Sequence, residues 1–142
     1  MSETGSLLTG LVWKEDSRSW AGSLKLASGL TVAVTVRAIS SLSKEVSPAS
    51  RSTLARLVLS ESEIRRAVAN SVVDEINDHW RTNPGRVKTK QITQRLEPIE
   101  LSIAIDGSAK IIYTDDGLFW GHPLSVQLSS VGTLESTCVL DS

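Results

Sequence analysis

Residues 47–80, in the middle of the chain, read SPASRSTLARLVLSESEIRRAVANSVVDEINDHW. Ser47 followed by Pro48 is typical of a helix start, because serine caps the free amides of the first turn and proline fits the first helical position. Further along, apolar residues recur every four positions and so share one face of a helix. This stripe comprises Ile64, Val68, Val72, Ile76 and Trp80. Ser60 and Glu63 have the form of a capping box, so the segment contains either one long helix or two.

Strands are predicted on both sides of this helical region. Before it, apolar and polar positions alternate in residues 11–13, 20–26 and 30–39. After it, the alternation recurs in residues 99–105, 109–113, 124–128 and 134–140. Asp106-Gly107 is a strong hairpin signal between two of these strands. Residues 82–96 are predicted to form a loop with a short helical turn around residues 90–96.

Strands grouped before and after helices imply an α+β fold with a mainly antiparallel sheet. We expect about seven strands, in the order three strands, one or two helices, four strands, with the helices packed on one face of the sheet. Each fully buried aliphatic side chain of the helical stripe is worth roughly 1.5–3 kcal/mol, so this layer is the expected main source of stability. The pattern leaves open whether the strands form one sheet or two.

Length and composition fit a single globular domain. The chain has 142 residues, of which 40% are hydrophobic, and residues 1–8 are expected to be a flexible tail. Fifteen Lys and Arg against sixteen Asp and Glu give a net charge of −1, which argues against a nucleic-acid or membrane-surface protein. No apolar run approaches the roughly 20 residues that span a bilayer, and the polar N-terminus does not have the pattern of a signal peptide. We therefore expect a cytoplasmic protein with no nucleic-acid and no membrane partner.

Charge is unevenly distributed towards the end of the chain. Residues 82–97 contain four basic groups against one acid, a net charge of +3. Residues 98–142 contain one basic group against six acids, a net charge of −5. The acidic last third is suited to a basic protein partner.

Residues that usually carry catalysis are sparse. Cys138 is the single cysteine, lies in a strand-like run near acidic residues, and is interpreted as a buried or edge-strand thiol rather than a nucleophile. His79 and His122 lie 43 residues apart and do not form a histidine pair at helical spacing, so we expect no metal site. Neither a Gly-x-Ser-x-Gly elbow nor a glycine-rich phosphate loop is present. The sequence therefore predicts no cofactor and no catalytic residue.

Tryptophan accounts for four of the six aromatic residues. Trp13 and Trp20 flank the first predicted turn and are expected to pack at the edge of the sheet. Trp80 closes the helical stripe and is expected in the core. Trp120 lies in the most distinctive segment of the chain.

That segment, residues 115–126, reads DDGLFWGHPLSV. It resembles the signature of a bacterial domain family of unknown function, whose members close with an Asp-Gly hairpin followed by an acidic turn and a Leu-Phe-Trp-Gly-His motif. The similarity is clearest over residues 92–126 and extends loosely to the opening hairpin with Trp13 and Trp20. Pro123 departs from the family pattern, which more often has serine there. Because proline lacks a backbone donor, strand pairing is expected to start one residue later.

The resemblance implies a fold and a binding role, and it carries over no catalytic residue. Such domains are similar in size to small bacterial proteins that occur beside secreted toxins and are proposed to neutralise them. On this interpretation, the candidate binding residues form one exposed edge. They are Asp115, Asp116, Trp120 and His122. The competing interpretation places Phe119 and Trp120 in the core and makes His122 a structural hydrogen-bonding group.

Three functions are compatible with the sequence. The leading hypothesis is a non-enzymatic domain that binds another protein, with an immunity-type inhibitor as its specific form. The alternative is a small-molecule-binding or enzymatic domain that uses the same edge from Asp115 to His122, in a deep pocket. A structural homodimer module is the third.

Overall fold

The computed structural model describes residues 10–39, 44–80, 85–114 and 122–140, except for the side chain of Trp80. Seven strands form a single sheet in which the spatial order of the strands is their order along the chain. The first part of the chain contains β1 (Leu11–Lys14), β2 (Ser19–Lys25) and β3 (Thr31–Arg37). The helical part contains α2 (Pro48–Glu75), a π-helical turn η1 (Ile76–Trp80) and α3 (Thr89–Arg95). The last part contains β4 (Glu97–Ile103), β5 (Ala109–Thr114), β6 (Leu124–Leu128) and β7 (Leu134–Val139).

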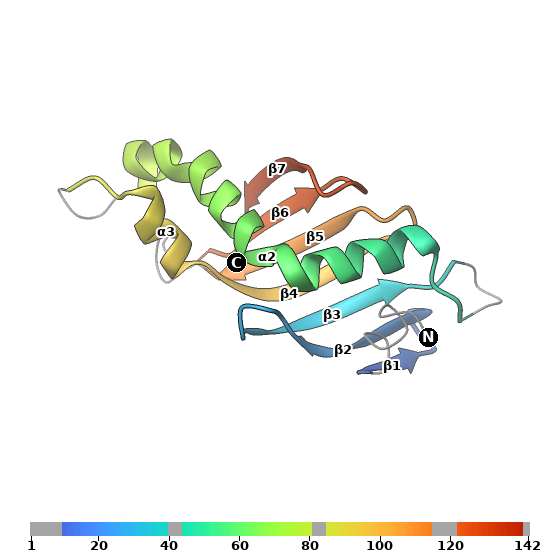
Figure 1. The fold of residues 1–142 in the computed structure, drawn as a ribbon. Helices are drawn as coiled ribbons and strands as arrows, with labels where there is room; N and C mark the ends of the chain where they lie inside the picture. Colours follow the sequence, from blue (N-terminus) through green and yellow to red (C-terminus); the bar gives the residue numbers. More distant parts are fainter. Residues whose placement is uncertain (1–9, 40–43, 81–84, 115–121, 141–142) are drawn as a thin grey trace.

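This architecture confirms the expected α+β fold, and the strands of the described residues all belong to one sheet. Figure 1 shows α2 running across one face of the sheet, with α3 beside the end of α2. Neighbouring strands are antiparallel except β3 and β4, which pair in parallel from Ala33 opposite Glu100 to Val36 opposite Ile103. A parallel pair needs a long crossover connection, and the helical segment between β3 and β4 provides it. The expected tail at residues 1–8 lies outside the described residues.

The helical region contains one long helix rather than two. The Ser47 side chain accepts a hydrogen bond from the Ser50 amide at 3.0 Å, so the predicted N-cap is confirmed. Ser60 instead lies within the 28-residue helix, where its hydroxyl donates to the Arg56 carbonyl at 2.6 Å. Three residues of the predicted stripe, Val68, Val72 and Ile76, are at most 1% exposed, and Ile64 is partly buried. The side chain of Trp80, which was predicted in the core, lies outside the described part of the structure. The predicted short turn around residues 90–96 is α3.

The core lies between α2 and the face of the sheet that α2 covers. The buried residues of α2 include Leu54, Leu57, Val68 and Val72. The strand side chains facing them alternate along each strand, as a half-buried sheet requires. They include Val32, Val34 and Val36 on β3, Leu101 and Ile103 on β4, Ile111 and Tyr113 on β5, and Leu124, Val126 and Leu128 on β6.

Hydroxyl groups in the first turns of α2 hold the helix against the β4–β5 turn. The Ser47, Ser50 and Thr53 hydroxyls donate to the carbonyls of Ile105, Ala104 and Gly107 at 2.7, 2.6 and 2.6 Å. Gly107 has a φ of +89°, a conformation that glycine adopts without steric cost, and the predicted hairpin turn is therefore confirmed. These hydrogen bonds fix where α2 begins relative to the sheet.

The two tryptophans of the first hairpin pack together at the edge of the sheet, as predicted. Trp13 on β1 lies opposite Trp20 on β2, with ring centroids 5.6 Å apart and an edge-to-face angle of 64°. The Trp20 indole donates to the Lys44 carbonyl at 2.8 Å, which ties the hairpin to the segment preceding α2. The Trp13 indole donates to Glu15 and lowers the pKa of that carboxyl, with Arg18 adding to the effect.

Candidate functional site

The segment singled out in the sequence is only partly described by the structure. Asp115, Asp116 and Trp120 lie outside the described residues. The two interpretations of Trp120, as a core residue or as a surface residue, therefore stay predictions. His122 is half-buried and lies just before β6. β6 begins at Leu124, directly after Pro123, as the missing proline donor predicts. The Pro123 carbonyl accepts a hydrogen bond from the Leu140 amide at 2.8 Å, so this end of the segment is held beside the end of β7.

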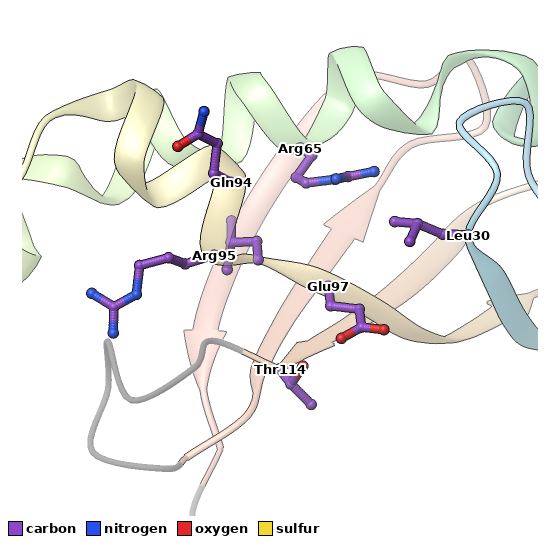
Figure 2. A pocket seen from close by; sticks show the side chains of 7 residues that line it. Leu30, Arg65, Gln94, Arg95, Glu97 and Thr114 are labelled. Carbon is purple, nitrogen blue, oxygen red and sulfur yellow. The ribbon is translucent and has the colours of Figure 1, made fainter.

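A hollow of about 500 Å³ is lined in part by Thr114, the residue that precedes Asp115 in the chain. Figure 2 shows Arg65 entering it from α2, with Glu97 and Thr114 below. The remaining lining residues are Leu30, Gln94, Arg95 and Leu96. The lining therefore includes two arginines and one glutamate, and two leucines contribute apolar surface.

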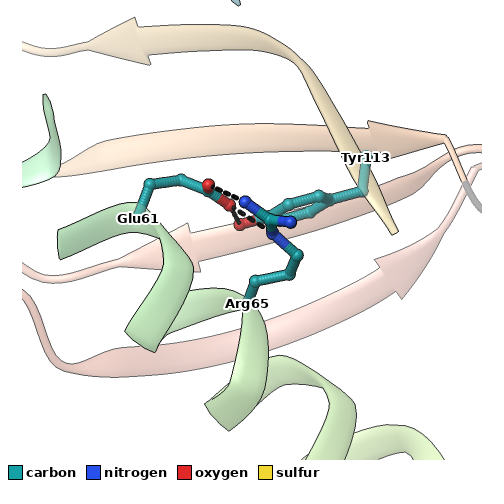
Figure 3. A network of polar contacts seen from close by, with 3 residues as sticks. All are labelled: Glu61, Arg65 and Tyr113. Atoms are coloured by element: carbon teal, nitrogen blue, oxygen red, sulfur yellow. Dashed lines mark hydrogen bonds and ion pairs between the residues drawn. The ribbon is translucent and has the colours of Figure 1, made fainter. Parts of the chain in front are cut away.

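Arg65 is fixed at this hollow by a buried network with Glu61 and Tyr113 (Figure 3). The Nε and Nη2 atoms of Arg65 donate to the two carboxylate oxygens of Glu61 at 3.1 and 2.5 Å. The Tyr113 hydroxyl donates to Oε2 of Glu61 at 2.7 Å. Glu61 is only 3% exposed and Tyr113 is fully buried. Each carboxylate oxygen already accepts from a neighbour, so the geometry suits Glu61 to positioning Arg65 rather than to removing a proton from a substrate.

The electrostatics of the network follow from burial. Loss of solvation raises the pKa of the Tyr113 hydroxyl far above its ordinary value, and the Glu61 charge raises it further. The hydrogen bond to Glu61 raises the pKa of the Arg65 guanidinium. The network therefore holds a neutral phenol and an ion pair together.

Tyr113 provides a direct test, because it is the single tyrosine of the chain. We expect the native protein to show no tyrosinate near pH 10, the ordinary pKa of tyrosine, and the unfolded protein in urea to titrate there. Because the native pKa is the higher of the two, the network's stabilisation is complete below about pH 10 and decreases as the pH rises above it. The measurement is near-ultraviolet tyrosinate absorbance recorded together with circular dichroism. Tyrosinate forming near pH 10 with a native dichroism spectrum contradicts the buried network.

The face of the sheet turned away from α2 is a second candidate, and we call it the open face. Its side chains alternate with those of the core along each strand. They are mostly small and polar, and include Ser23, Thr31, Ala33, Thr35, Ser102, Ser125 and Gln127. Ile112 lies on the same face and is 8% exposed. In the part of the chain that the structure describes, α2 covers the opposite side of the sheet, and α3 lies beside the end of α2.

A groove of about 410 Å³ crosses the middle of the open face, and we call it the open-face groove. Strand register builds it, because Thr35 lies opposite Ser102, Ser102 opposite Lys110, and Lys110 opposite Gln127. These four residues form one row across β3, β4, β5 and β6. The other lining residues are Arg37, Ile103, Ala104, Ser108 and Ala109. Small side chains leave the groove hollow, and the long side chains of Arg37, Lys110 and Gln127 flank it.

Two cationic side chains, and no acidic one, are among the described residues that line the open-face groove. Arg37 and Lys110 are exposed, and among the described residues neither takes part in an ion pair. At one end of the groove, the Ser108 hydroxyl and amide donate to Asp106 at 2.6 and 2.9 Å. These two hydrogen bonds lower the pKa of the Asp106 carboxyl. The hydroxyl of Ser108 is thus already engaged, whereas Arg37 and Lys110 are available to an anionic group.

Sequence reasoning missed this groove. Arg37 and Lys110 belong to different strands far apart in the chain, and only the parallel pairing of β3 with β4 brings their strands together. One signal was present, since the polar positions of β3 alternate with its buried valines and therefore lie on the opposite face. The acids of the last third do not gather on one described surface. Glu100 lies on the open face, Asp106 in the β4–β5 turn, and Glu135 on β7.

No helix in residues 48–80 or 89–95 is both long and apolar enough to cross a membrane. Among the described side chains, no group of three or more His, Cys, Asp or Glu lies close enough together to hold a metal ion. Cys138 lies on the edge strand β7 and is exposed, so of the two expected settings the edge strand is the observed one.

Comparison with known proteins gives a family and no function. A family model described as "Uncharacterized protein conserved in bacteria (DUF2262)" matches residues 6–139. No curated protein and no solved structure matches the chain. The match spans nearly the whole sequence, including every helix and strand described above. The chain therefore belongs to DUF2262, a family of uncharacterized proteins conserved in bacteria.

Proposed function

We propose that this chain is a non-enzymatic domain that binds another protein through the open face of its sheet. The observation that carries the proposal is the contrast between the two faces. One face is buried under α2, whereas the other presents exposed Thr31, Ala33 and Arg37 on β3 and exposed Lys110 on β5. Regular strands hold the backbone beneath these side chains in place, so little backbone conformational entropy is lost when a partner docks.

An immunity-type inhibitor of a secreted toxin is the specific form of this proposal. Its support is the resemblance to small bacterial domains of this kind, together with membership of a bacterial family. The proposal places the protein in the cytoplasm, where a single exposed thiol such as Cys138 stays reduced. It predicts a gene for a large secreted toxin beside the gene for this chain, whereas metabolic neighbours contradict the immunity form.

A small-molecule or enzymatic function is the second candidate, and the 500 Å³ hollow is the observation that favours it. Its described lining combines Arg65, held in place by Glu61, with Glu97 and Thr114. Asp115 and Asp116 follow Thr114 in the sequence and remain the proposed acidic residues of this site. Protein binding is preferred because both carboxylate oxygens of Glu61 already accept hydrogen bonds from Arg65 and Tyr113.

Site-specific photo-cross-linking tests the open face. A benzophenone amino acid replaces Ala33, which is exposed on β3, and in a matched variant replaces Ala67, which is exposed on α2. In cells of the source bacterium, we expect a discrete adduct with one other protein from position 33 and none from position 67. Adducts of equal yield from both positions, or none from position 33, contradict the proposal. An adduct of the chain with itself supports the homodimer interpretation instead.

The same cross-linking experiment tests two candidate binding residues that were predicted from the sequence, Trp120 and His122. Trp120→Ala and His122→Ala variants that remain folded but lose the cross-linked partner extend the binding surface to this segment. Variants that unfold identify the segment as core, and the open face then remains the proposed surface alone. Circular dichroism distinguishes the two results.

A further inference from the structure

We propose that the open-face groove recognises an acidic segment of the partner protein, with Arg37 and Lys110 as the residues that contact its carboxylates. This inference rests on the proposed protein-binding function and names the partner's chemistry. The acidic last third of the sequence predicts a basic partner, whereas this inference assigns an acidic segment to the partner.

The position of the two cations is the first argument. Arg37 ends β3 and Lys110 lies on β5, so the groove between them has β4 as its base. The side chains at this base are short, including Ser102 and Ala104. A carboxylate entering between the two cations therefore meets no bulky side chain there. Hydroxyl and amide groups from Thr35, Ser102 and Gln127 line the same row and can donate to it.

The charge of the surrounding face is the second argument. The register places Lys14, Lys25, Arg37 and Lys110 on the open face. Glu100 on β4 lies on the same face, two residues before Ser102 and diagonal to Lys110, whereas Glu97 lines the hollow beside Arg65. No ion pair joins Glu100 to Lys110 in the described residues. A net positive face steers and orients an acidic partner and repels a basic one.

The absence of stacking groups separates an acidic protein from a nucleic acid. The described aromatic side chains of Trp13, Trp20 and Tyr113 occupy strand positions on the helix-covered side of the sheet. Proteins that bind single strands combine cations with exposed aromatic rings, and the described open face has only the cations. The chain's net charge of −1 is also unfavourable for binding a polyanion as long as a nucleic acid.

Charge reversal tests the inference with a matched control. The probe is a dye-labelled peptide rich in Glu and Asp, and binding is followed by fluorescence anisotropy. The test variant is Arg37→Glu with Lys110→Glu, and the control is Lys14→Glu with Lys25→Glu. Both change the net charge equally on the same face. We expect the test variant to bind at least about tenfold more weakly and the control less than about threefold, because only the first two cations flank the groove.

The neutral pair Arg37→Gln with Lys110→Gln is the second variant, and circular dichroism verifies that each protein is folded. It is expected to weaken binding in the same direction by a smaller factor. Equal weakening in the test and control variants overturns the inference, as does failure of the wild-type protein to bind the peptide. Tighter binding of a dye-labelled single-stranded oligonucleotide, lost in the same test variant, also overturns it in favour of a nucleic acid.

Cross-linking separates this inference from the function on which it rests. If position 33 yields a discrete protein partner and the yield is unchanged by Arg37→Glu with Lys110→Glu, the acidic-partner inference fails and the proposed function remains. If position 33 yields no partner in the wild-type protein, the proposed function itself fails.

Discussion

Replacing Glu61 by alanine is expected to lower the free energy of unfolding by about 3–5 kcal/mol, the usual cost of removing one partner from a buried ion pair. The loss is large because the variant leaves two donors without an acceptor. The Tyr113 hydroxyl is fully buried, and the Arg65 side chain is 13% exposed. Urea denaturation followed by circular dichroism measures the change, with an unchanged slope showing that only stability is affected.

Two further variants show whether the ion pair or the packing around it is responsible. Tyr113→Phe removes one hydrogen bond and leaves the ion pair, so a loss of about 0.5–1.5 kcal/mol is expected. The triple variant Glu61→Leu, Arg65→Met, Tyr113→Phe keeps the side-chain volume without charge and is expected to regain most of the stability lost in Glu61→Ala. A Glu61→Ala protein as stable as wild type contradicts the network described here.

Replacing Gly107 by alanine is the second large effect, with an expected loss of about 2–5 kcal/mol. A φ of +89° disfavours any side chain, at a cost of roughly 1–2 kcal/mol. In addition, an added Cβ meets the Cβ and backbone oxygen of Ala49 at 3.0 and 3.1 Å, and such overpacking costs about 1–3 kcal/mol. The helix has little room to move away, because Thr53 donates to the Gly107 carbonyl.

Gly29→Ala is the matched control for Gly107→Ala. Gly29 has a similar φ of +97°, but an added Cβ there meets nothing within 4 Å. Its expected loss is therefore the conformational part alone, about 1–2 kcal/mol. Thermal or urea unfolding of the two variants side by side measures the difference. Equal losses indicate that α2 shifts freely at its first turn, which contradicts a tight junction with the β4–β5 turn.

The elements of the fold could be predicted from the sequence because their signals are local. Ser47 with Pro48 sets the start of α2, the four-residue spacing from Ile64 to Ile76 sets its buried face, and Asp106-Gly107 sets a hairpin. Ser60 was ambiguous, because a capping box and a mid-helix serine differ only in backbone conformation. In the structure its hydroxyl bonds to the preceding turn of the helix.

Features that depend on contacts between residues far apart in the sequence could not be predicted. No local pattern in the sequence indicates that β3 pairs in parallel with β4. Without that pairing, nothing places Arg37 and Lys110 near each other in space. Glu61 was likewise unremarkable as one acid in a polar stretch, until Tyr113 was placed opposite it. The segment from Asp115 to Trp120 stays a sequence-based prediction, because it lies outside the described residues.

The strand order has a consequence for how the chain folds. Because spatial order follows chain order, every antiparallel pair joins strands that are adjacent in the sequence, and such hairpins close in about 1–10 μs. Among the strand pairs, β3 with β4 requires the chain to close a long loop, which comprises residues 38–96. We expect that loop closure, rather than hairpin formation, limits the folding rate, since its entropic cost is incurred before the contacts that offset it form. We therefore expect the three strands before α2 and the four strands after it to form separately, and to pair through β3 and β4 as α2 docks across one face.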